Sequence, residues 1–200
     1  MSFGVYERNV GPISAALAPV LKGVCGPALE IGSGTGQHVQ DFATAFADLC
    51  WTPSDPDAAH RTSIDAWSAH FKSGVAPARA IDAASDWAAD VADLGPLSLI
   101  LSLNVIHIAP PAVLSGILKG AAATLAPRGL LAFYGPFREG GVHTGDGNAA
   151  FDDRLRADNP DWGIRDVDDI RAQAATLGLG FHDLIHMPAN NRILIFSQSG

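Results

Sequence analysis

The sequence predicts an α/β protein built on a seven-stranded, doubly wound and mostly parallel sheet that ends in an antiparallel hairpin. Short apolar runs alternate with helical patterns five times between residues 28 and 134, and such alternation is typical of a parallel sheet covered by helices on both faces. Two apolar runs, Phe181–Met187 and Arg192–Gln198, close the chain, and the four residues between them are too few for a helical crossover. This terminal hairpin separates the chain from all-parallel dinucleotide-binding folds.

The first half of the chain is predicted to contain four strands, each followed by a helical segment. A short helix at 12–22 precedes them, because Pro12 suits a first helical turn and Gly23 suits a helix end. The strands are expected at 28–31, 50–53, 77–81 and 97–103, and the helices at 36–48, from Asp55–Pro56 to Gly74, at 84–93, and from Pro111 to about Leu125. The strand at 97–103 is a continuous apolar run, which is typical of a strand buried on both faces.

The second half continues the sheet and then changes character. A turn is expected at Pro127–Gly129, followed by a strand at Leu130–Tyr134. Residues 135–163 are rich in glycine and polar residues without a strand pattern, and only a helix at about 147–157 is expected there. A helix from Asp166 to about Leu177 leads into the hairpin. We expect a single domain, 1–200, in which 135–163 is a substrate-side insert or lid, because long irregular connections in compact domains are usually functional or disordered.

Composition limits the classes of partner. The formal net charge of −8 argues against nucleic acid, whose phosphates require a basic surface. The apolar region 97–114 is interrupted by polar residues and prolines, so no membrane span is expected, and the N-terminus has no apolar signal core. Cys25 and Cys50 form no metal-binding spacing. We therefore expect a cytoplasmic protein without a metal site, with reduced thiols favoured over a disulfide; the oligomeric state stays open.

A glycine-rich segment, Ala28-Leu-Glu-Ile-Gly-Ser-Gly-Thr-Gly-Gln-His38, is the strongest functional pattern. It is predicted to be a strand, a tight turn and a helix start, with Gly32, Gly34 and Gly36 in the turn. The dinucleotide fingerprint G-x-G-x-x-G would need a glycine at the position of Gln37. The carboxylate of Glu30 before the glycines indicates a ligand that carries a cation rather than a pyrophosphate. S-adenosylmethionine fits this description; a nicotinamide or flavin cofactor and a turn without any ligand are the alternatives.

Polar residues end each predicted parallel strand, where ligands bind in open α/β sheets. Asp55 is expected to accept hydrogen bonds from both ribose hydroxyls, and Asp82 to accept one from the adenine amino group. Asn104 is expected near the amino-acid end of the cofactor or near the substrate. Each has a structural alternative: Asp55 and Asp82 as helix caps, and Asn104 as a strand-end turn residue. With the glycine segment, the expected cofactor residues include Glu30, Gly32, Ser33, Gly34, Gly36, Asp55, Asp82 and Asn104.

Methyl transfer from a sulfonium donor requires mainly positioning, and a general base contributes only if the acceptor carries a proton. His107, just after the strand at 97–103, is the first candidate base, and His143 in the insert is the second. A hydrogen-bonded structural role is the alternative for both. The expected substrate-side residues are Tyr134, Phe137, Asn148, Phe151 and Arg165.

Four segments resemble the methyltransferase-like protein 26 family: Glu7–Ile13, Ala28–His38, Tyr134–Phe137, and Asn148 through Phe151 to Gly163–Asp166. The resemblance covers nearly the whole chain and implies the class I methyltransferase fold, S-adenosylmethionine as cofactor and a cytosolic single domain. It also implies that Arg8 and Asn9 lie at the cofactor. It implies no particular substrate.

The sequence therefore predicts an S-adenosylmethionine-dependent methyltransferase that acts on an unidentified small molecule. The alternatives are a regulatory protein that binds S-adenosylmethionine or S-adenosylhomocysteine without turnover, and an NAD-dependent oxidoreductase.

Overall fold

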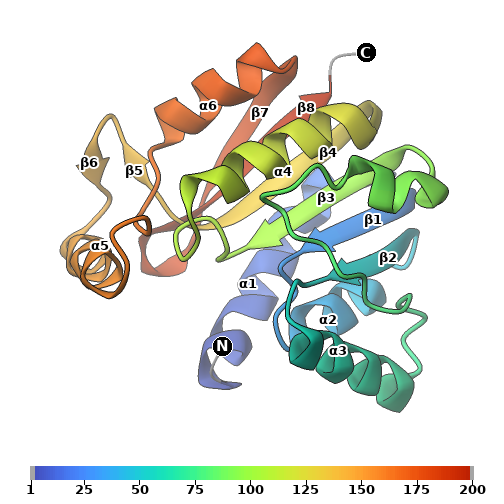
Figure 1. Ribbon diagram of the computed structural model, residues 1–200. Coiled ribbons are helices and arrows are strands. Elements are labelled where there is room, and N and C mark those ends of the chain that lie inside the picture. Colours follow the sequence, from blue (N-terminus) through green and yellow to red (C-terminus); the bar gives the residue numbers. More distant parts are fainter. Residues whose placement is uncertain (1–2, 199–200) are drawn as a thin grey trace.

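A twisted sheet of six strands forms the centre of the computed structural model, which describes residues 3–198, with side chains from Tyr6 onward (Figure 1). The strands are β1 (Gly26–Ile31), β2 (Leu49–Ser54), β3 (Leu97–Leu103), β4 (Leu125–Pro136), β7 (Leu179–His186) and β8 (Asn191–Gln198), in the order β2-β1-β3-β4-β8-β7. The first four are parallel, and β8 lies antiparallel to both β4 and β7. The predicted mostly parallel sheet with an antiparallel hairpin is confirmed.

Helices cover both faces of this sheet. On one face lie α1 (Phe3–Val20), α2 (Gln37–Ala45) and α3 (Ala58–Phe71); on the other lie the 3-10 helix η1 (Ala88–Leu94), α4 (Pro111–Thr124) and α6 (Val167–Thr176). Side chains of β3 alternate between the two cores: Leu99 and Leu101 pack on the first face and Ile100 on the second. The strand is buried on both faces, as its apolar run predicts.

The predicted seventh strand, 77–81, was wrong. Arg79 forms a single parallel bridge to Ser54, in which Arg79 N–H donates to the Pro53 carbonyl at 3.0 Å and Asp55 N–H donates to the Arg79 carbonyl at 3.0 Å. The next bridge of a parallel ladder would need the N–H groups of residues 77 and 53, and both are prolines, which have none. The segment therefore lies beside β2 without continuing the sheet.

Helix α1 begins nine residues before the predicted start, and Pro12 lies inside it rather than in its first turn. Ile13, Leu17 and Leu21 follow at intervals of four and are buried, so their packing outweighs the break that a proline favours. Gly23 ends the segment with a φ of 77°. The longer helix brings Arg8 and Asn9 to the sheet edge.

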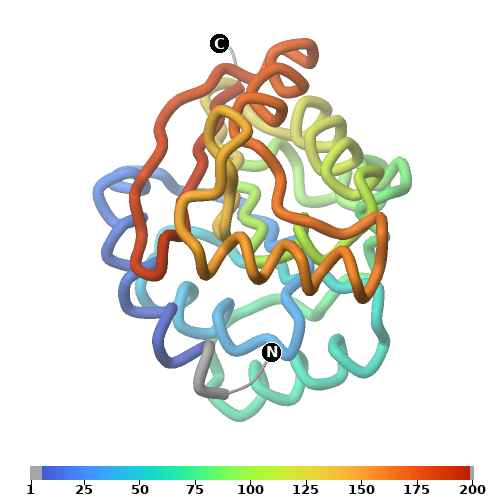
Figure 2. Tube along the Cα trace, turned by 90° about the vertical axis from the view of Figure 1, so that its left-hand side faces the viewer, coloured from blue at the N-terminus to red at the C-terminus, as the bar shows by residue number. Residues whose placement is uncertain are grey.

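The insert after β4 carries more structure than the sequence predicted. Helix α5 (Asp146–Asp158) agrees with the expected helix, but a short hairpin of β5 (Arg138–Glu139) and β6 (Val142–His143) precedes it, where no strand was expected. The turn at Pro127–Gly129 is an irregularity inside β4, because Leu97 and Leu99 pair with Leu125 and Leu130. Viewed onto the sheet edge, α5 lies across it above α2 and α3, and the short helix η2 (Pro188–Asn190) lies beside the start of α5 (Figure 2).

The two cysteines and the helix lengths bear on two further expectations. Cys25 and Cys50 are free and exposed. No helix within residues 3–198 is both long and apolar enough to cross a bilayer.

Candidate functional site

An open cleft of about 960 Å³ lies at the carboxyl ends of β1, β2 and β3, and residues of α1 and α5 complete its lining. The chain passes from β1 to β2 on one side and later to β3 on the other, so the cleft sits where the strand order reverses. Nine residues that the sequence predicts for the site line it: Arg8, Asn9, Gly32, Gly34, Asp55, Asn104, His107, Asn148 and Phe151.

The three glycines of the loop after β1 all have positive φ but do different things. A Cβ on Gly32 would lie 2.4 Å from Val105 Cγ2, and one on Gly36 would lie 2.7 Å from Ile64 Cγ1, so both positions are closed by packing. A Cβ on Gly34 would meet nothing within 4 Å. Gly34 therefore leaves open space between the backbone and the cleft, as a loop that receives a ligand requires.

Glu30 ends β1 as a buried carboxylate beneath this loop. Its Oε2 has no hydrogen-bond partner among the described residues. Burial raises the pKa of Glu30 to about 7, a hydrogen bond from Ser33 opposes that shift, and the charge of Asp55 adds to it. An unpartnered buried carboxylate is costly, and a ligand cation placed beside it would remove much of that cost.

His38, at the start of α2, shares a small cavity of about 30 Å³ with Glu30 and the glycine loop. Its Nε2 is buried without a partner among the described residues, and burial lowers the pKa of His38 to about 4. The ring is therefore neutral near pH 7. Sequence reasoning missed this residue, because its position beneath the loop depends on how α2 packs against the sheet.

Asp55 is buried just after β2 and faces the cleft. Gly34 N–H donates to its Oδ2 at 2.9 Å, Asp57 N–H donates to its Oδ1 at 2.9 Å, and His60 Nδ1 lies 3.1 Å from the same oxygen. The cap of α3 is Asp57, whose Oδ1 accepts from Ala59 N–H at 2.7 Å, so the expectation that Asp55 caps and begins this helix was wrong. A carboxylate has about four acceptor sites, which leaves Asp55 room for one more donor.

Asp82 and Asn104 differ in their relation to the cleft. Asp82 is exposed, does not line the cleft and accepts from Ala84 N–H at 2.9 Å in a turn; the N-cap of the next helix, η1, is Trp87, so Asp82 does not cap it either. Asn104 has the left-handed φ of 57°, and its N–H donates to the Tyr134 carbonyl at 2.8 Å. Asn104 lines the cleft, so it lies where a residue that contacts the cofactor or the substrate would have to be.

The two candidate bases lie in different environments. His107 is buried in the cleft wall, and its ring meets Phe151 edge-on at 5.7 Å between centroids. Burial and then the charge of Arg165 lower the pKa of His107 to about 4, so its ring is neutral and can accept a proton. His143 does not line the cleft; its Nε2 lies 3.0 Å from Asp152 Oδ2.

Three predicted substrate-side residues hold the walls of the cleft instead of lining it. The Tyr134 hydroxyl accepts from Asn191 Nδ2 at 2.9 Å, and Phe137 is buried in the core. Arg165 donates from Nε to the Ile106 carbonyl at 3.1 Å and from its guanidinium to the carbonyls of Ala109 and Asp161. Arg165 thereby links Asp161 in the insert to the loop after β3, whereas the Tyr134 bond joins β4 to β8.

Several lining residues were not predicted from the sequence. Arg154 lies one turn after Phe151 on α5, and its guanidinium carbon sits 5.7 Å from the Phe151 ring centroid. The i,i+3 spacing on an expected helix would have revealed this neighbour. His60, Ile108 and Asn191 reach the cleft through tertiary packing and carry no such signal.

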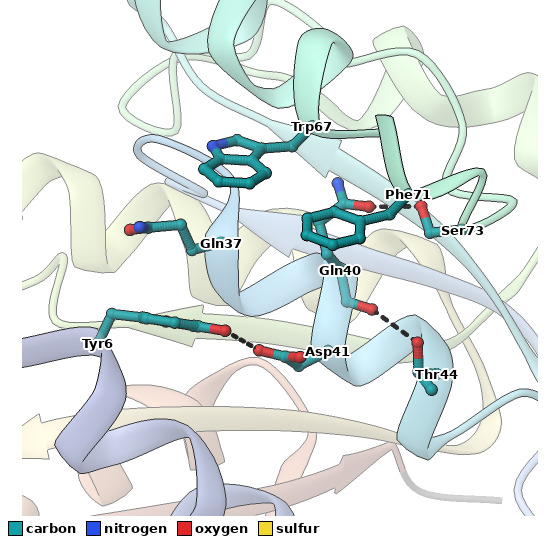
Figure 3. Close-up of a pocket in the computed structure, with 8 residues that line it drawn as sticks. All are labelled: Tyr6, Gln37, Gln40, Asp41, Thr44, Trp67, Phe71 and Ser73. Atoms are coloured by element: carbon teal, nitrogen blue, oxygen red, sulfur yellow. Dashed lines mark hydrogen bonds between the residues drawn. The ribbon is translucent and has the colours of Figure 1, made fainter. Parts of the chain in front are cut away.

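A second, smaller cavity of about 240 Å³ lies between α1, α2 and α3 (Figure 3). Its polar groups pair with one another: the Tyr6 hydroxyl donates to Asp41, and the Ser73 hydroxyl donates to Gln40. Burial and then Asp41 raise the pKa of Tyr6 to about 12. Because these side chains already have partners, the cavity is a weaker candidate for a ligand site than the cleft. Across residues 3–198, no cluster of three or more His, Cys, Asp or Glu could hold a metal ion.

Comparison with known proteins agrees with this architecture. The family described as "Protein of unknown function (DUF938)" matches residues 2–198. The chain belongs to this family. Its fold is also similar to that of larger methyltransferases, of which it spans about half the length.

Three solved structures illustrate the likeness. The S-adenosylmethionine-dependent methyltransferase SibL is 18% identical, with a TM-score of 0.76 over 98% of this chain and 56% of SibL. The mitomycin 7-O-methyltransferase MmcR is 16% identical, with a TM-score of 0.76 over 98% of this chain and 54% of MmcR. Human N-acetylserotonin methyltransferase in complex with S-adenosylmethionine is 13% identical, with a TM-score of 0.77 over 98% of this chain and 53% of the human protein. At these identities the likeness shows a shared fold.

Proposed function

We propose that this protein is an S-adenosylmethionine-dependent methyltransferase whose acceptor is a small molecule. The observation that carries the proposal is the buried carboxylate of Glu30, which has an unpartnered oxygen beneath a glycine loop that opens into the cleft. A cationic ligand suits this carboxylate better than a diphosphate, which would add negative charge beside it. The resemblance to the methyltransferase-like protein 26 family and the folds of the similar methyltransferases support the same cofactor.

The cleft residues fit this cofactor at three points. Glu30 would face its ammonium group, the open backbone at Gly34 would lie against it, and the remaining acceptor capacity of Asp55 suits a ribose hydroxyl. Arg8 and Asn9, from α1, line the same cleft and remain part of the proposed cofactor site, as do Ser33 and Asn104. When bound, S-adenosylmethionine supplies an activated methyl group.

The protein's own contribution would be positioning, exclusion of water and proton removal. His107 lines the cleft with a neutral ring, and this position, rather than its lowered pKa, makes it the candidate to take the acceptor's proton. Helix α5 contributes Asn148 and Phe151 to the cleft, and we propose that the insert 135–163 of the single domain acts as the substrate-side lid. A cytoplasmic location belongs to the proposal as an expectation from the sequence.

Calorimetric titration tests the cofactor directly. The wild-type protein should bind S-adenosylhomocysteine at one site and should not bind NADH. Tight binding of NADH alone would reverse the assignment. Incubation with methyl-labelled S-adenosylmethionine and a small-molecule cell extract should then transfer label, whereas binding without any labelled acceptor would leave a protein without turnover.

A further inference from the structure

We propose that the methyl acceptor is a small organic anion, with a carboxylate or phosphate on an apolar body, and that Arg154 binds its charged group. This inference rests on the proposed methyltransferase function and names the substrate class of the same cleft.

Two arginines of the cleft have no polar partner within the part of the chain that the structure describes. The chain carries a formal net charge of −8, yet two arginines, Arg8 and Arg154, line the cleft. Neither makes a hydrogen bond or an ion pair within residues 3–198. In contrast, Arg79 pairs with Asp93, and Arg192 pairs with Glu139. An acidic protein that leaves two guanidinium groups unpaired in its principal cleft has positive charge available there for a ligand.

The acids of the cleft do not cancel this charge. Asp55 accepts from two backbone N–H groups and lies against His60, and Asp57 caps α3. Both carboxylates are turned toward the ends of β1 and α3, whereas Arg154 projects from α5 on the insert side. The acceptor side of the cleft therefore favours an anion, and a guanidinium can bind a carboxylate or phosphate through two parallel hydrogen bonds.

Among the described residues, the number of unpaired arginines in the cleft equals the number of anionic groups that the two ligands would bring. S-adenosylmethionine brings one carboxylate of its own, and Arg8 belongs to the proposed cofactor site. Arg154 is then the remaining unpaired cation for the second molecule in the cleft.

The surroundings of Arg154 set the size and polarity of the acceptor. The Arg154 guanidinium carbon lies 5.7 Å from the Phe151 ring centroid, and the Phe151 centroid lies 5.7 Å from that of the neutral His107. Ile108, which also lines the cleft, adds an apolar wall. Because the Arg154 guanidinium and the His107 ring both lie against Phe151, a small molecule could place its anion at Arg154 and its nucleophile at His107, with its apolar part against Phe151.

Matched pairs of compounds test the inference. With the protein saturated by S-adenosylhomocysteine, calorimetry would compare 4-hydroxybenzoate with 4-hydroxybenzamide, and phenyl phosphate with phenol. The wild type should bind at least one anion roughly tenfold or more tighter than its neutral partner, as a charged hydrogen bond allows. The pair that shows the preference identifies a carboxylate or a phosphate as the preferred group.

Two variants locate the effect. Arg154→Ala should abolish the preference and keep the wild-type affinity for S-adenosylhomocysteine, because Arg154 is exposed. Arg171→Ala is the matched control: Arg171 also lies over a phenylalanine ring, 4.2 Å from the Phe181 centroid, but on α6, away from the cleft. It should keep the preference.

The inference is overturned if neither anion is preferred by the wild type, including the case in which none of the compounds binds, or if Arg154→Ala retains the preference. Failure of the wild type to bind S-adenosylhomocysteine would instead overturn the proposed function, so the two failures are distinguishable.

Discussion

Two regions that border the cleft, the glycine loop after β1 and the insert after β4, contain buried polar residues with opposite hydrogen bonding. Beneath the glycine loop, Glu30 Oε2 and His38 Nε2 are buried without partners among the described residues. In the insert, Asp152 is equally buried but accepts from Ile164 N–H at 2.6 Å and also contacts His143 and Arg156. Within residues 3–198, Glu30 and His38 each keep one buried polar atom unsatisfied, whereas both carboxylate oxygens of Asp152 are paired.

This difference separates a binding site from a structural joint. Paired groups such as Asp152 hold the insert in one conformation, because each would be costly to leave unmade. Unpaired buried groups cost the protein stability, and a ligand that supplied the missing partner would remove that cost.

His107→Ala should lower the rate of methyl transfer by ~10²-fold or more, the usual contribution of a general base. The measurement is transfer of labelled methyl to the extract fraction that the wild type methylates. Affinity for S-adenosylhomocysteine serves as the control and should stay near the wild-type value. Equal losses of rate and affinity would make His107 a structural residue.

Glu30→Gln should stabilise the protein at high pH. The pKa of Glu30 is raised from 4.5 to about 7, so the cost of ionising it in the fold is absent below pH 4.5, grows between these values and is complete above pH 7. At pH 8 the free energy of unfolding should rise by about 3 kcal/mol, and near pH 4.5 the gain should vanish. Urea unfolding across this range measures it.

The exposed Glu7→Gln is the control for this pH series and should show no comparable gain. A Glu30→Gln protein no more stable than the wild type at pH 8 would mean that Glu30 is already paired in solution.

Asp55→Ala should weaken binding of S-adenosylhomocysteine by ~1–3 kcal/mol, because it removes an acceptor from the cleft and leaves Gly34 N–H unpaired. Calorimetry measures the affinity, and Asp65→Ala is the comparison, because Asp65 is exposed, accepts from Ala78 N–H at 2.9 Å and does not line the cleft. Unchanged affinity in Asp55→Ala would remove Asp55 from the site.

His143→Ala should have the smallest effect. The pair with Asp152 is partly exposed on the histidine side, and such pairs contribute ~0–1 kcal/mol. Thermal unfolding should change little, and binding of S-adenosylhomocysteine should not change. A selective loss of methyl transfer in this variant would restore His143 as a candidate base.

The sequence predicts most of the fold because its strongest patterns are local. The apolar run of β3, the glycines after β1 and the short join between β7 and β8 each specify a strand or turn without help from distant residues. The prediction of a seventh strand was wrong because Pro77 and Pro53 together remove one bridge of the ladder. The apolar pattern of one segment does not show which residues will lie opposite it. The predicted start of α1 was wrong because burial of Ile13 and Leu17 outweighs the preference of Pro12 for a first helical turn.

The residues of the candidate site that can be predicted from the sequence are those that lie at or just after the carboxyl end of a parallel strand. Asp55 and Asn104 line the cleft, and Glu30 lines the small cavity beneath the glycine loop, because the carboxyl ends of parallel strands share one edge. Residues in the insert divide into cleft and core only through packing: Phe151 faces the cleft, whereas Phe137, also an aromatic residue of that segment, is buried. No pattern in the sequence distinguishes them.

The most direct test of the account is a calorimetric titration of the wild type and Glu30→Gln with S-adenosylhomocysteine at pH 8. We expect one site in the wild type and an affinity roughly tenfold or more lower in the variant, the scale of a hydrogen bond to a charged group. Equal affinity in the two proteins, or no binding by the wild type, would contradict the claim that this buried carboxylate receives the cofactor's cation.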